Sequence, residues 1–81
     1  MDLTNIYIIY DITAFSKSKI IEEIKAEGYD HNFIFGSDIT SGDEKRKYMK
    51  HCTEIWLWGE CSKINDYCLA EEMGIDLWQM G

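Results

Sequence analysis

The chain has 81 residues, of which 46% are hydrophobic and 14% aromatic, and it contains no proline. A chain of this length and density is expected to form one small domain over residues 1–81, which excludes a disordered protein and a repeat array. Its formal net charge of −7 repels a phosphate backbone and argues against direct binding of nucleic acid.

The first apolar run, residues 5–12, predicts a buried strand that breaks off into polar residues. Ser16 or Ser18 can cap a helix after it, and Gly28 is expected to end that helix. Residues 31–36 predict a second strand. Residues 5–36 are therefore predicted to form a strand, a helix and a second strand.

A second helix is predicted to begin at residues 41–44, because Ser41 can accept a hydrogen bond from the backbone of Glu44 while the Glu44 side chain reaches back. This helix carries the basic cluster Lys45-Arg46-Lys47 with Lys50. We interpret that cluster as a solvated face, and a phosphate clamp is the alternative.

Residues 55–58 predict a third strand that is apolar on both of its faces, as a central parallel strand must be. Ser62 can cap a third helix, which is expected to bury Ile64 and Cys68 and to end at Gly74. The last apolar run then predicts a short fourth strand.

The fourth strand covers residues 75–80, so the order of elements is βαβαβαβ. Right-handed crossovers then require a parallel sheet with helices on its faces. The predicted fold class is α/β, a single small flavodoxin- or Rossmann-like three-layer domain with a four-stranded parallel sheet and three helices. Three helices cannot cover both faces completely, so apolar surface is expected around Trp78 and Met80, which favours a homodimer or a bound partner.

Asp11, Glu60 and Asp66 follow predicted strands, so they are expected to meet at the carboxyl edge of the sheet. Carboxylates there can accept hydrogen bonds from ribose hydroxyls, bind a hard cation or share a proton. The competing interpretation is that they are solvated loop acids. Ser62 and the following helix N-terminus could hold an anion, or Ser62 could simply cap the helix.

Tyr7 and Tyr10 are separated by an odd number of positions, so their side chains are expected on opposite faces of the sheet. Tyr7 is then a core residue with its hydroxyl near the site, and Tyr10 can stack on a base or plug the pocket. Trp56 and Trp58 share a face and are expected in the core or in an oligomer interface.

The chain contains three cysteines, an odd number that argues for free thiols. Their spacings match no common zinc pattern, so neither a metal site nor a cofactor is expected. The first residues lack the features of a signal peptide, and no apolar run approaches a membrane span. We therefore expect a cytoplasmic protein that does not bind membranes.

Ile6-Tyr7-Ile8 and Ile12-Thr13 resemble the first-strand motif I-Y-I-S-G-P-I-T of the nucleoside 2-deoxyribosyltransferase-like superfamily, in its short, often phage-encoded DUF4406-type branch. A second motif of that branch is resembled at Cys52, Glu54, Glu60, Ser62, Asp66, Ala70 and Gly74. The resemblance implies Asp66 and Glu60 as catalytic candidates and a ligand site at Tyr7, Tyr10, Asp11 and Ser62.

The chain departs from this family at Ile9-Tyr10-Asp11, where the motif has Ser-Gly-Pro, and at Asp66, which is one methylene shorter than the nucleophilic glutamate. The expected function is therefore binding of a nucleoside, a nucleotide or a related sugar-containing molecule with weak or no catalysis. A phage source would place the protein in the host cytoplasm. One alternative is an acidic inhibitor that binds a host protein, and a second is an N-glycoside hydrolase or transferase that uses Asp66.

Overall fold

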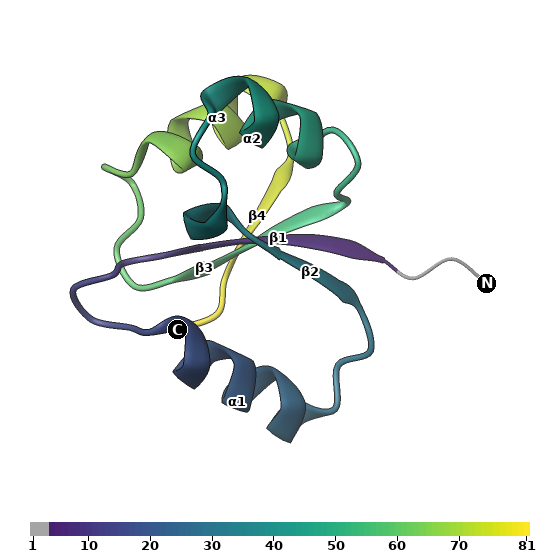
Figure 1. The fold of residues 1–81 in the computed structure, drawn as a ribbon, viewed down its shortest axis with the longest axis vertical. Helices are drawn as coiled ribbons and strands as arrows, with labels where there is room; N and C mark the ends of the chain where they lie inside the picture. Colours follow the sequence, from purple (N-terminus) through teal and green to yellow (C-terminus); the bar gives the residue numbers. More distant parts are fainter. Residues whose placement is uncertain (1–3) are drawn as a thin grey trace.

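Four parallel strands form one sheet in the order β2-β1-β3-β4 in the computed structural model, which describes residues 4–81 (Figure 1). The start of the expected domain, residues 1–3, lies outside the described part. The strands are β1 Asn5–Tyr10, β2 Asn32–Phe35, β3 Glu54–Trp58 and β4 Asp76–Gln79. The helices are α1 Lys17–Glu27, α2 Gly42–Met49 and α3 Asn65–Met73, with a short 3-10 turn η1 at Gly36–Asp38. The predicted α/β fold class is confirmed.

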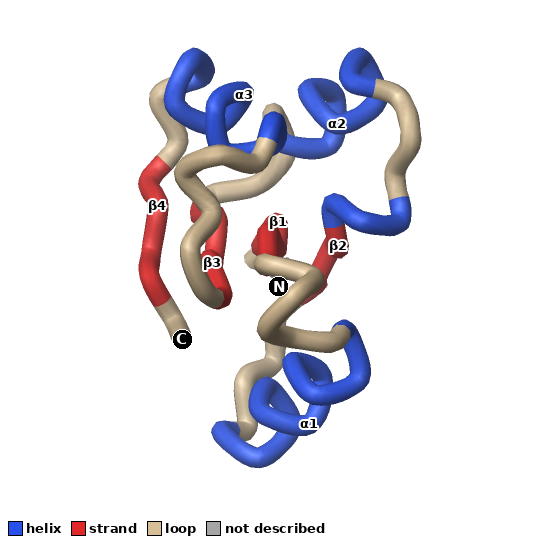
Figure 2. Tube along the Cα trace, turned by 90° about the vertical axis from the view of Figure 1, so that its left-hand side faces the viewer, coloured by secondary structure: helices blue, strands red, loops and turns tan. Residues whose placement is uncertain are grey.

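The helices divide unequally between the two faces of the sheet. Figure 2 shows α1 alone on one face and α2 with α3 on the other. In the sheet, β2 lies on one side of β1, while β3 and β4 lie on the other side. The connection from β1 to β2 therefore runs in one direction along the sheet, and the connections to β3 and β4 run in the opposite direction. A right-handed crossover in each direction puts its helix on the opposite face. The direction therefore switches between β1 and β3, and a crevice is expected at the carboxyl ends of these two strands.

Apolar side chains at alternate positions of the strands pack between the sheet and α1. Trp56 and Trp58 are buried there, which confirms that they share one face and belong to the core. Both indole N–H groups find carboxylate acceptors, because Trp56 donates to Glu54 at 2.9 Å and Trp58 donates to Glu23 at 2.8 Å. The remaining buried members of this cluster are Ile6, Ile8, Ile20, Ile24 and Phe35.

The opposite face packs against α2 and α3. Tyr7 and Ile9 of β1 point to this side, next to Ile55 and Leu57 of β3. The helices and loops contribute Met49, Cys52, Cys61, Leu69 and Ala70 to the same cluster. Tyr10 packs against the α1-side cluster instead, so the prediction that Tyr7 and Tyr10 lie on opposite faces is confirmed.

Two helix starts were predicted correctly from their caps. The Ser16 hydroxyl accepts a hydrogen bond from the backbone of Lys19 at 3.3 Å, and the Ser41 hydroxyl accepts one from the backbone of Glu44 at 3.5 Å. Helix α1 ends at Gly28, whose φ of 75° is the left-handed conformation that favours glycine.

The predicted start of the third helix at Ser62 is wrong. Helix α3 begins at Asn65, and the Ser62 hydroxyl donates to the carboxylate of Glu60 and caps no helix. The expected burial of Cys68 is also wrong, because that side chain is exposed. The buried positions of α3 are Asp66, Leu69 and Ala70.

Apolar surface remains at the β4 edge of the sheet. The side chain of Trp78 is 52% exposed, which confirms the expected exposure there, whereas Met80 is half-buried. Ile12 in the loop after β1 is 74% exposed, and this was not anticipated. Among residues 4–81, no helix has both the length and the apolar character needed to cross a membrane.

Candidate functional site

A pocket of about 240 Å³ opens at the carboxyl ends of the strands, where the crossover direction switches. One wall follows β1, a second comes from the segment after β2, and a third comes from the start of α3. Polar and apolar side chains both face it. The lining residues are Ile9, Tyr10, Asp11, Ile12, Ser37, Lys45, Ile64 and Asp66.

The Asp66 carboxylate is the innermost charge of this pocket and is only 5% exposed. One oxygen, Oδ2, accepts the Tyr7 hydroxyl at 2.9 Å, and the other, Oδ1, accepts the Lys45 ammonium at 2.7 Å. Asp66 also lies in the first turn of α3, where the helix dipole stabilises a negative charge. The buried carboxylate is thus hydrogen-bonded at both oxygens, as a buried charge requires.

Tyr7 is a core residue, as predicted, and its hydroxyl donates to Asp66. Tyr7 itself is not among the residues that line the pocket. Burial, followed by the negative charge of Asp66 and the hydrogen bond to it, raises the pKa of Tyr7 above its usual range. The phenol therefore remains protonated at neutral pH. It acts as a hydrogen-bond donor to Asp66 and cannot serve as a general base.

Gly36 makes the approach of Tyr7 and Asp66 possible. A Cβ at Gly36 would lie 2.3 Å from Asp66 Oδ2 and 2.7 Å from the Tyr7 hydroxyl, which is closer than real Cβ atoms come. The residue is buried where β2 ends. Its role is to leave space for the hydrogen-bonded pair, and sequence reasoning did not identify it.

Lys45 corrects the interpretation of the basic cluster on α2. The side chain was expected in solvent, but it is only 18% exposed and its ammonium faces Asp66. Arg46 pairs with Asp43 on the same helix at 3.4 Å, while Lys47 and Lys50 are exposed. The cluster therefore contains one inward-facing lysine beside solvated neighbours.

Asp11 lines the same pocket, but part of its carboxylate is engaged locally. Oδ1 accepts the Thr13 hydroxyl at 2.6 Å and the Thr13 backbone N–H at 2.9 Å. These two hydrogen bonds hold the pKa of Asp11 below its usual range, and the bond from the Thr13 hydroxyl has the larger effect. Asp11 is therefore an anion at neutral pH, and its second oxygen, Oδ2, remains for a ligand.

Glu60 and Ser62 do not line the pocket, although both were predicted site residues. The Glu60 carboxylate accepts the Ser62 hydroxyl and, at 3.0 Å, the Ser62 backbone N–H. These two hydrogen bonds lower the pKa of Glu60, and the bond from the Ser62 hydroxyl has the larger effect. Glu60 and Ser62 are thus hydrogen-bonded to each other. Of the three carboxylates expected at the site, only those of Asp11 and Asp66 line the pocket.

Tyr10 lines the pocket without filling it, since about 240 Å³ remains. Its ring packs edge-to-face on Phe35, with 6.3 Å between the ring centroids. Its hydroxyl lies 3.1 Å from the hydroxyl of Ser37, which was not among the predicted residues. These two hydroxyls therefore form a hydrogen-bonded pair among the residues that line the pocket.

The cysteines offer no activated nucleophile at this site. Cys52 and Cys61 are free and buried, and burial raises the pKa of Cys52 to about 11 and also raises that of Cys61. Cys68 is free and exposed. Within the described range, no group of three or more His, Cys, Asp or Glu side chains is arranged to hold a metal ion.

Comparison of the chain with protein-family models, with curated proteins and with solved structures finds no match. The resemblance to the deoxyribosyltransferase-like superfamily therefore stays a prediction, and the geometry of the site carries the functional argument.

Gly36→Ala is expected to destabilise the protein by about 2 kcal/mol, because its methyl group would overlap the hydrogen-bonded pair of Tyr7 and Asp66. Urea unfolding followed by tryptophan fluorescence measures the change. Gly42→Ala is the matched control, since a Cβ there meets nothing within 4 Å. Equal stability of the two variants would contradict the role assigned to Gly36.

Lys45→Met is expected to cost about 3 kcal/mol, because it leaves the Asp66 carboxylate buried without its cation. Lys47→Met on the exposed side of the same helix should change stability by less than about 0.5 kcal/mol. Adding Asp66→Asn to Lys45→Met should recover part of the loss. Thermal and urea unfolding of the four proteins test this, and similar effects of the two lysine changes would refute the buried pair.

Thr13→Val is expected to raise the pKa of Asp11 toward its ordinary value, because it removes the hydroxyl hydrogen bond. A depressed folded-state pKa contributes stability above the unfolded-state pKa, and this contribution is lost as the pH falls through the folded-state pKa. The variant should therefore lose less stability on acidification. Carbon-13 NMR titration of the carboxyl group measures the pKa, and Thr13→Ser, which keeps the hydroxyl, should retain the low value.

Proposed function

We propose that this protein binds a nucleoside, or a small molecule with a similar sugar, at the carboxyl edge of its sheet, without efficient glycosyl transfer. The observation that carries the proposal is the open pocket between Asp11 and Asp66 at the switch between β1 and β3. Parallel α/β sheets bind their ligands at this position. The resemblance of the strand motifs to deoxyribosyltransferase-like proteins supports the same class of ligand.

The pocket offers distinct partners for a sugar and for a base. The second oxygen of Asp11 can accept hydrogen bonds from sugar hydroxyls, and the hydroxyls of Ser37 and Tyr10 can donate or accept. Ile12 and Ile64 provide apolar surface on which a planar base can lie. Burial of Ile12 by the base would remove exposed apolar area from water.

Size and charge favour a nucleoside over larger or phosphorylated ligands. A volume of about 240 Å³ lies below the usual range of pockets for drug-sized ligands, which begins near roughly 300 Å³. The lysine that lines the pocket is already paired with Asp66, so it is not free to neutralise a phosphate. Asp11 and the neighbouring Glu60 carry negative charge and would repel one.

The environment of Asp66 supports binding more than catalysis. Both carboxylate oxygens are hydrogen-bonded and the residue is nearly buried, so attack on a sugar carbon would first require Tyr7 or Lys45 to withdraw. A nucleophile must reach its target at about 3–3.5 Å in the productive geometry. The alternative of an N-glycoside hydrolase that uses Asp66 depends on such a rearrangement.

Saturation-transfer NMR with adenosine, deoxyadenosine, thymidine and thymidine monophosphate tests the proposal. At least one nucleoside should receive magnetisation from the protein, and Asp11→Asn should weaken its binding about tenfold through loss of a charged hydrogen bond. The asparagine carbonyl still accepts from Thr13, so the loop is kept. Asp76→Asn, an exposed change on β4, is the control.

The same samples distinguish the alternatives. No saturation transfer to any nucleoside, or equal binding by the Asp11→Asn and Asp76→Asn variants, would overturn the proposed binding site. If the protein releases free base from a nucleoside and the Asp66→Asn variant does not, the protein is a hydrolase instead. We also propose that the exposed indole of Trp78 lies in a homodimer interface. Sedimentation equilibrium measures this separately, and Trp78→Ser should weaken self-association.

A further inference from the structure

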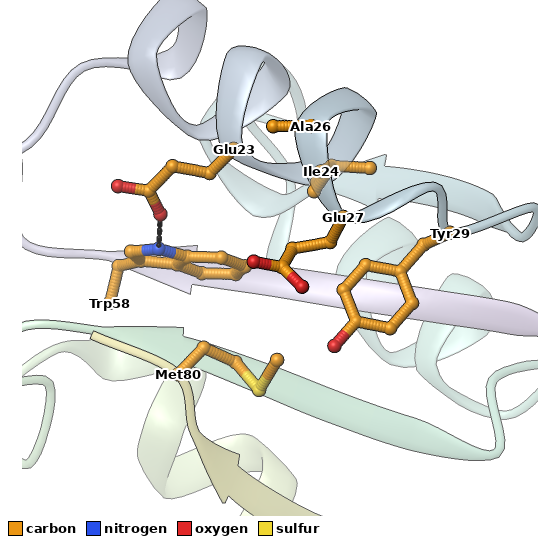
Figure 3. A pocket seen from close by; sticks show the side chains of 7 residues that line it. All are labelled: Glu23, Ile24, Ala26, Glu27, Tyr29, Trp58 and Met80. Atoms are coloured by element: carbon orange, nitrogen blue, oxygen red, sulfur yellow. Dashed lines mark hydrogen bonds between the residues drawn. The ribbon is translucent and has the colours of Figure 1, made fainter.

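A second cavity of about 380 Å³ lies between α1 and the side of the sheet formed by β3 and the end of β4 (Figure 3). It is distinct from the nucleoside pocket and shares no lining residue with it. Tyr29 and Met80 line it on two sides, and Trp58 forms its floor. Glu23 and Glu27 extend over it from α1 (Figure 3). We call this cavity the α1 groove.

The two carboxylates of the α1 groove are held near each other on one helix. Glu23 and Glu27 are four residues apart, a spacing at which like charges destabilise a helix. The ion pairs within residues 4–81 are Lys17–Asp38, Lys45–Asp66 and Arg46–Asp43, so neither glutamate has a cationic partner there. The groove therefore carries negative charge that no described side chain neutralises.

A hydrogen bond constrains the position of one of these exposed glutamates, Glu23. The indole N–H of Trp58 donates to Glu23 Oε2 at 2.8 Å, which fixes that carboxylate above the floor. The Glu27 carboxylate lies between the indole of Trp58 and the ring of Tyr29 (Figure 3). Trp58 is only 3% exposed, whereas Tyr29 is 41% exposed. The Tyr29 ring stacks on His31 and packs edge-to-face with Trp56, so a ligand can reach the part of this ring that those two side chains leave uncovered.

We propose that the α1 groove binds an arginine side chain from a basic segment of a partner protein. A guanidinium group can form two parallel hydrogen bonds to the Glu27 carboxylate and lie flat against the Tyr29 ring. The thioether of Met80 can contact the aliphatic part of the same side chain. The net charge of −7 attracts a basic partner before contact is made.

The chemistry of the groove favours arginine over other cations. A lysine ammonium would form point contacts without the planar match to both a carboxylate and a ring. A metal ion would lack ligands, since no group of three suitable side chains exists within the described residues. The cavity is larger than one guanidinium group, so residues that flank the arginine in a peptide segment also fit.

Peptide titration tests this proposal independently of nucleoside binding. The probe is a blocked pentapeptide with the sequence Ala-Arg-Ala-Arg-Ala, and its control replaces both arginines by citrulline, which has the same shape without the charge. Proton–nitrogen NMR follows the indole N–H of Trp58. We expect the arginine peptide to shift this signal in a saturable way and the citrulline peptide to leave it unchanged.

Two double variants separate the groove from general charge attraction. The Glu23→Gln/Glu27→Gln variant should bind the peptide about tenfold more weakly, because the charged contact to Glu27 and the neighbouring negative charge of Glu23 are both lost. The side-chain carbonyl of the first substitution still accepts the Trp58 indole N–H, so the groove keeps its shape. Glu22→Gln/Glu72→Gln removes the same charge at exposed positions outside the groove and should change affinity less than about twofold.

Three results of the peptide titration would overturn the assignment, and a fourth result comes from self-association. The three are a citrulline peptide that binds as well as the arginine peptide, equal weakening by the two double variants, and the absence of any saturable shift of the Trp58 signal. Self-association that protects the indole N–H of Trp58 from exchange with solvent would show that a second copy of the chain occupies the groove. This result would also refute an arginine-bearing partner.

Discussion

The buried carboxylate of Asp66 needs a donor at each oxygen, and meeting this need joins three elements that are distant in sequence. Tyr7 on β1 supplies one donor across 59 positions, and Lys45 on α2 supplies the other across 21. Gly36 must then remain without a side chain so that these groups can meet. A missing donor would leave a charged group desolvated, which is among the more costly defects in a protein interior.

The same arrangement gives the carboxyl edge of the sheet its chemical character. Because Lys45 is held by Asp66, the pocket presents one available carboxylate at Asp11, neutral hydroxyls and apolar walls. The α1 groove has a different balance, with two carboxylates, a partly exposed aromatic ring and no cation among its described lining residues. The two surfaces therefore offer different chemistry to a ligand, and the fold places them at separate locations.

The parts of this structure that local patterns determine were predictable from the sequence. The four apolar runs, the Ser16 and Ser41 caps and the Gly28 helix end depend on neighbouring residues alone. The inward turn of Lys45 depends on which face of α2 meets α3, although its position four residues before the buried Met49 was an available signal. Ser62 was assigned wrongly because Glu60, two residues earlier, competes for its hydroxyl.

The unequal coverage of the sheet has a consequence for how the molecule opens. Helix α1 contributes only two buried side chains to its face of the sheet, Ile20 and Ile24, and no second helix of the described chain lies beside it. Segments with few buried contacts detach at lower free energy than the whole domain unfolds. Transient release of α1 would carry Glu23 and Glu27 away from Trp58 while the Tyr7, Lys45 and Asp66 cluster stays assembled, so amide protons of this helix should exchange with solvent ahead of those in β1 and β3.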